Sequence, residues 1–206
     1  MIANAPESAD TDFNVRRFAA DVNKDLADVF GNLVNRTIRF AHQAFQGRVP
    51  DGGQPGELEA ALAAEIDQRI GALRRDHEAL EFRRAVAELR GIWALANAYL
   101  QQAAPWTVAK SDSARAAVAT RTALNLVRLS AILAWNVIPS LAEAVLAAFD
   151  SKQAVPAWPN EPASSILADK AGQPVSPIGP LVEKITHDEI DRLQQMFGGT
   201  GAQNLA

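Results

Sequence analysis

The chain is 206 residues long with a net charge of −4, and it contains 48% hydrophobic and 21% charged residues. This balance is typical of a folded globular chain and excludes a disordered one. The absence of cysteine excludes disulfides, thiol catalysis and cysteine-ligated zinc. The three histidines, His42, His77 and His187, form no ligand-spaced pair, so we expect no metal in this chain.

The charges are unevenly distributed along the sequence. Two stretches, 29–50 and 113–142, contain no acidic residue. Their six arginines are Arg36, Arg39, Arg48, Arg115, Arg121 and Arg128. Such segregation can build a positive face on an acidic protein, although solvated arginines without partners would give the same pattern.

Forty alanines and long stretches without Gly or Pro favour helix throughout the first 150 residues. We predict a first helix from a cap near Asp12 to about Phe45. Its apolar residues recur every three or four positions, at Val15, Phe18, Val22, Leu26, Val29 and Leu33. A Gly/Pro-rich loop at 47–56 then interrupts the pattern.

Further helices are expected at about 57–77, from about 79 to just before Pro105, at about 112–137, and in a short segment after Pro139. The longest uncharged apolar-rich stretch, 129–142, is shorter than the roughly 18 residues of a membrane span. With no signal peptide after Met1, these features predict a soluble, cytoplasmic chain.

The composition changes after Asp150, where prolines become frequent. They predict an extended arm that crosses a surface. A final helix is expected from an N-cap at Thr186, with Glu189 completing a capping box, to a stop at 198–199. The predicted fold is therefore all-α: one antiparallel bundle of about five helices (1–150), followed by a proline-rich arm and a short terminal helix (151–206).

No enzyme motif is present. The sequence has no Gly-rich phosphate loop, no G-x-S-x-G elbow and no HExxH, and Asp51-Gly52-Gly53 is a turn between helices. The acidic pair Glu78 and Glu81 lies on a charged helix surface and is best explained by solvation. We expect no catalytic residue, no cofactor and no metal in this chain.

A polar row on the first helix is the main candidate site. Asn32 and Arg36 are four residues apart, and Arg39 and Gln43 continue the row at the rim of the apolar stripe. An amide and a planar guanidinium together can recognise the edge of an unpaired base. An ordinary polar boundary of the bundle would give the same row.

Trp106 is the second candidate. It follows Pro105 between two predicted helices, so helix amphipathicity does not place it there, and Lys110 lies four residues beyond. An indole at the rim of a bundle offers a stacking surface for a base, whereas the alternative is a ring folded back over the bundle end. Of the other tryptophans, we expect Trp93 and Trp135 in the core and Trp158 attaching the arm to the bundle.

Two motifs carry a family resemblance. Residues 23–36, NKDLADVFGNLVNR, resemble the pattern N-x-D-L-x-x-x-x-G-N-L-x-x-R of the C-terminal, anticodon-binding helical domain of methionyl-tRNA synthetases. Residues 93–110, WALANAYLQQAAPWTVAK, resemble the end of that domain's third helix, where N-x-Y leads to A-P-W and a lysine. The motifs occur in the family's order, and the resemblance covers almost the whole chain.

The resemblance implies roles for individual residues. In the family, an asparagine and an arginine of the first helix bond to anticodon bases, chiefly the wobble cytosine, and a tryptophan stacks on an unstacked base. The matching residues are Asn32, Arg36 and Trp106. Candidate phosphate or loop contacts are Arg39, Gln43, Lys110, Arg115, Arg121 and Arg128. The sequence departs from the family at Asp28, where asparagine is frequent, and around Pro180-Leu181.

The family's catalytic domain is missing: neither HIGH nor KMSKS occurs, and no cysteine is available for its zinc-bearing insertion. ATP and zinc would belong to that domain. We expect a truncated synthetase rather than an independent gene, with methionine-accepting tRNA and a catalytic synthetase domain as partners, and with no membrane or DNA contact. The alternative is a stand-alone interaction module that docks on a separate catalytic subunit through its proline-rich arm.

Overall fold

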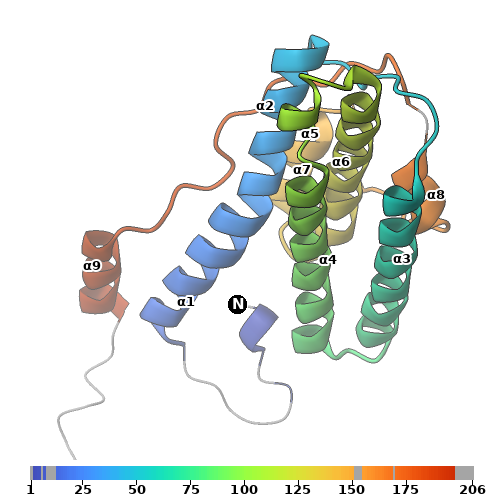
Figure 1. Cartoon of the computed structure of the whole chain (residues 1–206). Helices are drawn as coiled ribbons and strands as arrows, with labels where there is room; N and C mark the ends of the chain where they lie inside the picture. The colour runs from blue at the N-terminus through green and yellow to red at the C-terminus, as the bar shows by residue number, and fades with distance from the viewer. Residues whose placement is uncertain (1, 6, 8–12, 151–154, 169, 198–206) are drawn as a thin grey trace, which may run out of the picture.

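The computed structural model describes residues 2–5, 7, 13–150, 155–168 and 170–197 (Figure 1). Within these ranges all regular elements are helices, and one isolated bridge joins Arg48 to Pro174. The all-α prediction is therefore confirmed. A short 3-10 turn, η1 (Ile2–Asn4), lies against the side of the bundle at α4.

The predicted first helix is one long rod made of three parts: α1 (Val15–Asp21), the π-helical segment η2 (Val22–Gly31) and α2 (Asn32–Phe45) (Figure 1). Its first turn is capped by Asn14, whose side chain accepts the Arg17 N–H at 2.9 Å. The expected cap, Asp12, lies outside the described residues. The rod ends at Phe45 because Gln46 and Gly47 adopt left-handed φ angles of 55° and 66°.

The remaining bundle helices follow the predicted order. They are α3 (Glu57–Glu78), α4 (Phe82–Ala103), the short α5 (Pro105–Val108), α6 (Ser113–Ala134) and α7 (Pro139–Ala147). Pro105 and Pro139 each begin a helix, where the missing N–H costs no hydrogen bond. Local signals of capping and proline placement thus set most boundaries to within a few residues of the prediction.

Helix α6 forms the centre of the core. It packs against α2, α4, α5, α7 and α8, and it is buried along almost its whole length. Of the described helices, it alone is long and apolar enough to cross a membrane, but 89% of that stretch is buried inside the bundle. A central core helix of a folded domain has these same properties. The interior also contains Trp93, which is 2% exposed and stacks on Phe30, whereas Trp135 is half-buried and only packs against the core.

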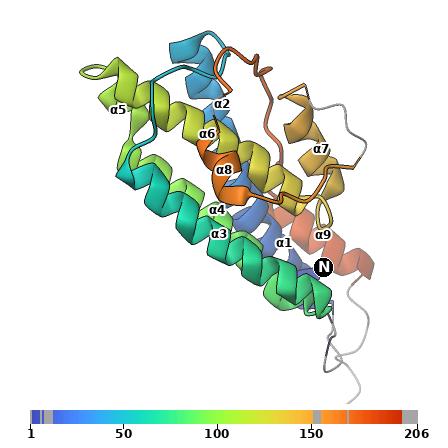
Figure 2. The same cartoon turned by 90° about the vertical axis from the view of Figure 1, so that its right-hand side faces the viewer.

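The arm after the bundle is less extended than predicted, because it contains the short helix α8 (Pro162–Leu167). Helix α8 packs on α3 and α6, and Figure 2 shows it in front of the middle of α6. Its Ile166, and Val175 further along, belong to the same core as the bundle. Trp158 attaches the arm as expected, since it packs against that core with its ring centroid 6.1 Å from that of His77.

The terminal helix α9 (His187–Phe197) packs on α1 through a small apolar cluster that includes Ile190. The capping box is confirmed: the Thr186 N–H donates to the Glu189 carboxylate at 2.8 Å, and the Glu189 N–H donates to the Thr186 hydroxyl at 3.3 Å. The predicted stop at 198–199 lies outside the described residues.

Candidate nucleic-acid interface

The structure brings Arg36 and Trp106 into direct contact at one end of the bundle. The guanidinium carbon of Arg36 lies over the indole, 4.5 Å from the ring centroid. Asn32 is one turn earlier on α2 and is exposed. The two predicted candidates, which are 70 positions apart in sequence, therefore belong to one surface, formed by α2 and α5 (Figure 1).

The position of Trp106 follows from the short link between α4 and α6. Ala104 ends α4 in a left-handed conformation with φ 37°, and Pro105 begins α5 and is buried. This abrupt turn directs the next residue toward α2. The indole is half-buried and packs against the core. It is thus neither a fully solvated ring nor one sealed inside the helices.

Phe40 is a third member of this cluster that sequence reasoning missed. It lies four residues after Arg36 on α2, and its ring meets that of Trp106 at a centroid distance of 6.3 Å and an interplanar angle of 85°. Such edge-to-face contacts are favourable and orient the rings. The same i, i+4 spacing that linked Asn32 to Arg36 could have found Phe40.

The π-helical segment determines which way Asn32 faces. The Asn32 N–H bonds to the carbonyl of Ala27, five residues earlier, so the rod gains a residue just before α2. In this wide turn a Cβ on Gly31 would lie 2.8 Å from the Leu26 carbonyl oxygen, so any side chain here would force the backbone to shift. Asn97, from the second motif, donates to the Val29 carbonyl at 3.1 Å and supports the segment from α4.

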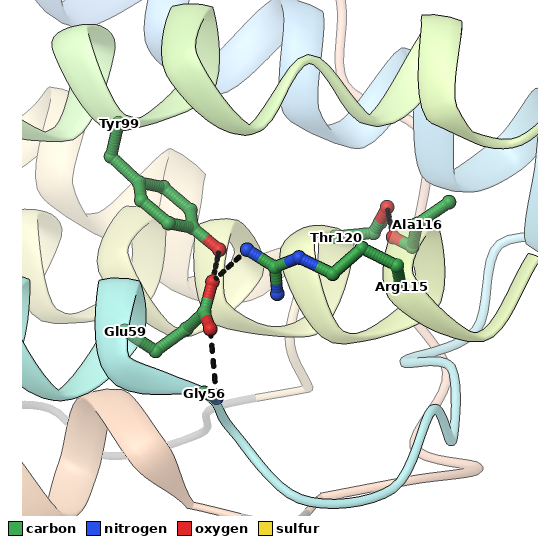
Figure 3. Close-up of polar contacts among 6 residues, drawn as sticks. All are labelled: Gly56, Glu59, Tyr99, Arg115, Ala116 and Thr120. Atoms are coloured by element: carbon green, nitrogen blue, oxygen red, sulfur yellow. Dashed lines mark hydrogen bonds and ion pairs between the residues drawn. The ribbon is translucent and has the colours of Figure 1, made fainter. Parts of the chain in front are cut away.

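A buried carboxylate holds the two helix ends that flank the α5 link (Figure 3). Glu59 is 0% exposed, and its Oε1 accepts from the Tyr99 hydroxyl at 2.7 Å and from the Arg115 guanidinium at 2.6 Å. Its Oε2 accepts the Gly56 N–H at 2.9 Å. Tyr99 is in the last turns of α4 and Arg115 in the first turn of α6, so Glu59 ties both to the start of α3.

This cluster perturbs the titration of its members. Burial by itself would raise the pKa of Glu59, but the hydrogen bonds from Arg115, Tyr99 and Gly56 outweigh it, so the pKa is lowered. Burial and the bond to Glu59 raise the pKa of Tyr99. The bond to Glu59 raises the pKa of Arg115. Glu59 is therefore an ionised, fully bonded structural group.

The second acid-free stretch does not form the positive face that its sequence suggested. Arg115 is committed to Glu59, and the Arg121 side chain is 3% exposed, bonded to the Gly53 carbonyl and 3.7 Å from Asp51. Both charges are paired within the fold, and the role of these arginines as phosphate contacts stays a prediction. Arg128 lines a separate hollow beneath the arm, away from α5.

The other candidate contacts stay at the surface. Arg39, Gln43 and Lys110 are exposed, and Arg39 and Lys110 have no ion-pair partner in the part of the chain that the structure describes. Asp28, where the sequence departs from the family pattern, pairs with Lys184 at 2.6 Å. This exposed ion pair joins the rod to the chain just before α9.

The protein is a helical bundle domain with an amide, a guanidinium and an indole at one end. A family model described as "Anticodon binding domain of methionyl tRNA ligase" matches residues 49–202, and one described as "tRNA synthetases class I (M)" matches residues 1–38. The chain therefore belongs to the methionyl-tRNA ligase family and contains its anticodon-binding domain. Trp106 falls in the segment 49–202, matched by the anticodon-binding model, whereas Asn32 and Arg36 fall in the segment 1–38, matched by the class I model.

Individual relatives agree. The chain is 42% identical over 199 residues to the methionine–tRNA ligase of Ruegeria sp. strain TM1040 and 43% identical over 200 residues to that of Caulobacter sp. strain K31. Each alignment covers 97% of this chain but 34% and 35% of the relative, so the chain spans about a third of their length.

Solved structures share the fold. The free form of Mycobacterium tuberculosis methionyl-tRNA synthetase superposes with a TM-score of 0.77 at 24% identity, covering 90% of this chain and 37% of that one. Its complex with methionyl-adenylate gives a TM-score of 0.75, covering 88% and 36%.

Proposed function

We propose that this chain binds the anticodon loop of a methionine-accepting tRNA, with Asn32 and Arg36 bonding to base edges and Trp106 stacking on an unstacked base. The observation that carries the proposal is the contact of the Arg36 guanidinium with the Trp106 ring, beside the exposed Asn32. Hydrogen-bonding groups and a stacking surface next to one another are what recognition of an extruded base requires.

In the free chain Arg36 covers a face of the indole by a cation–π contact. An entering base would displace the guanidinium from the ring and take its place as the stacking partner. Stacking of one base on an aromatic ring is worth about 1–3 kcal/mol. The freed guanidinium would then donate in-plane hydrogen bonds to the base edge, which supplies selectivity.

The exposed Arg39 and Lys110 would contact the phosphates of the loop, and Gln43 would add a neutral contact. Contacts to the phosphates of a single strand make binding weaken as salt is added. The logarithm of the binding constant falls with the logarithm of the salt concentration, with a slope of about −0.7 for each phosphate neutralised. ATP, zinc and the aminoacylation chemistry would belong to a catalytic domain outside this chain, in the cytoplasm. The threefold greater length of the relatives supports this division.

The alternative function, docking through the proline-rich arm, is less well supported. Three apolar residues of the arm, Pro162, Ile166 and Val175, are buried within the fold. This part of the arm is therefore already occupied by the bundle and is not free to bind a second protein.

The test is the affinity of the chain for a fluorescent anticodon stem-loop with a wobble cytosine, compared with one carrying uridine there. We expect Trp106→Ala and Arg36→Ala to weaken binding by about tenfold or more, and Arg36→Ala to reduce the preference for cytosine. Arg75→Ala, an exposed arginine on α3, is the matched control. Equal affinities of Arg36→Ala, Trp106→Ala and the parent chain would refute the proposal.

A further inference from the structure

The hollow beneath the arm lies away from the Trp106 surface. Its volume is about 250 Å³, and it is bounded by α6 on one side and by the arm around Trp158 and α8 on the other. Arg128 contributes to it from α6, and Lys170 from the segment after α8. Arg128 is about four helical turns, or some 22 Å, from the start of α6, where α5 joins it.

Two positive charges line the hollow, with no counter-ion among the lining residues that the structure describes. Arg128 and Lys170 both line it, and none of the lining residues that the structure describes is acidic. Within that part of the chain neither cation forms an ion pair. Burial and then the charge of Arg128 lower the pKa of Lys170, so the ammonium group is held there at an electrostatic cost.

Hydrogen bonds between α6 and the arm fix the backbone of the arm beside this hollow. The Asn125 side-chain amide donates to the carbonyls of Ile166 and Ala168, both at 2.9 Å, which fixes the segment leading to Lys170. Asn125 precedes Arg128 by three residues, so both lie on one face of α6. The packing of the arm on α6 therefore brings both cations to the same hollow.

Other groups around the hollow also favour a negative charge. Arg74 donates to the carbonyl of Pro159 at 3.2 Å, and its guanidinium carbon lies 5.7 Å from the centroid of the Trp158 ring. The Trp158 Nε1–H is buried and has no hydrogen-bond partner among the described residues. Trp158, Pro159 and Ser165 all line the hollow.

We propose that this hollow binds a phosphate group, with Arg128 and Lys170 as its charged donors. A guanidinium fork beside an ammonium matches the several oxygens of a phosphate, and the bound anion offsets the repulsion between the two cations. The phosphate group comes either from a free phosphate or phosphomonoester, or from the diester backbone of an RNA. This site is separate from Asn32, Arg36 and Trp106, and phosphate binding here does not depend on the proposed base contacts.

The test uses the indole N–H signals of the chain in two-dimensional NMR during titration with inorganic phosphate. The Trp158 signal is assigned by its loss in Trp158→Phe. We expect a saturable shift of this signal that sodium chloride at matched ionic strength does not produce. Arg128→Gln and Lys170→Gln should each weaken phosphate binding by about tenfold. Arg75→Gln, an exposed arginine on α3, should bind phosphate as the parent does.

Unchanged signals from the other three tryptophans and an unchanged melting temperature would show that each variant is folded. A shift that does not saturate, that sodium chloride reproduces, or that survives in both Gln variants would overturn the proposal.

The source of the phosphate is distinguished by measuring tRNA affinity with the same variants. A weaker affinity of Arg128→Gln for tRNA identifies an RNA backbone phosphate, and an unchanged affinity identifies a free phosphate or monoester. Because inorganic phosphate is the probe, the experiment can refute phosphate binding in the hollow without refuting base recognition at Trp106. Equally, the stem-loop experiment can refute base recognition without refuting phosphate binding.

Discussion

The buried carboxylate of Glu59 should be a major source of stability at the recognition end of the bundle. In Glu59→Gln the side chain keeps its size but loses its charge, and its amide NH₂ must face a donor: Arg115, Tyr99 or the Gly56 N–H. Hydrogen bonds to a charged group contribute about 1.5–3 kcal/mol. Since the Arg115 side chain is 32% exposed, the lower part of this range applies to its bond. We expect the free energy of unfolding to fall by about 2 kcal/mol.

Urea denaturation followed by circular dichroism measures this change, with Glu57→Gln as a control, because Glu57 is an exposed carboxylate on the same helix. A double-mutant cycle with Arg115→Met isolates the ion pair, and we expect a coupling of about 1 kcal/mol. A loss below about 0.5 kcal/mol for Glu59→Gln, which is the usual range for surface substitutions, would refute the reasoning.

The same substitution has a pH signature. The pKa of Glu59 is lowered in the folded chain, so its contribution is present above the unfolded value of about 4.5 and is lost as the pH falls through the folded value. The parent chain should therefore lose its advantage over Glu59→Gln in acid. An advantage that is constant down to the lowest pH at which the chain folds would contradict the assignment of an ionised Glu59.

Three further predictions concern other parts of the structure. Phe40→Leu should weaken stem-loop binding several-fold at unchanged melting temperature, because the Trp106 ring loses its edge contact; unchanged binding would remove Phe40 from the site. Gly31→Ala should destabilise the chain by about 1–3 kcal/mol in urea, since its Cβ would meet a backbone oxygen, and a neutral effect would contradict the wide turn. Burial lowers the pKa of His77, so stability should fall as the pH drops through its ordinary value near 6.5, where the unfolded chain takes up the proton. Melting temperatures of the parent and His77→Gln across that range test this, and parallel curves would exclude it.

Two of the three base-contacting candidates came from spacing along one helix. Asn32 and Arg36 share a face of α2 because an α-helix repeats every 3.6 residues, and this holds whatever packs against the helix. Trp106 was singled out because Pro105 ends the preceding helix. Helix periodicity contains no information on the distance between Trp106 and Arg36, since their contact depends on how α5 turns toward α2.

Charge patterning was a poorer guide than spacing. The acid-free stretch 113–142 suggested a positive face, yet Arg115 and Arg121 pair with groups near the start of α3 and in the loop before it. A partner more than fifty residues away does not show in a local count of charges. The π-helical turn at Gly31 was not predicted either, because the apolar residues around it still recur every three or four positions, as in an ordinary α-helix.

Alanine content, proline and glycine positions and side-chain caps were sufficient to establish the helices, their order and most of their ends, because these signals act within one or two turns of the chain. Packing alone decided the stacking of Arg36 on Trp106, the burial of Glu59 and the enclosure of Arg128 with Lys170. Each of these contacts joins segments that are distant in sequence, and the free energy that holds them together comes from burying the helices around α6.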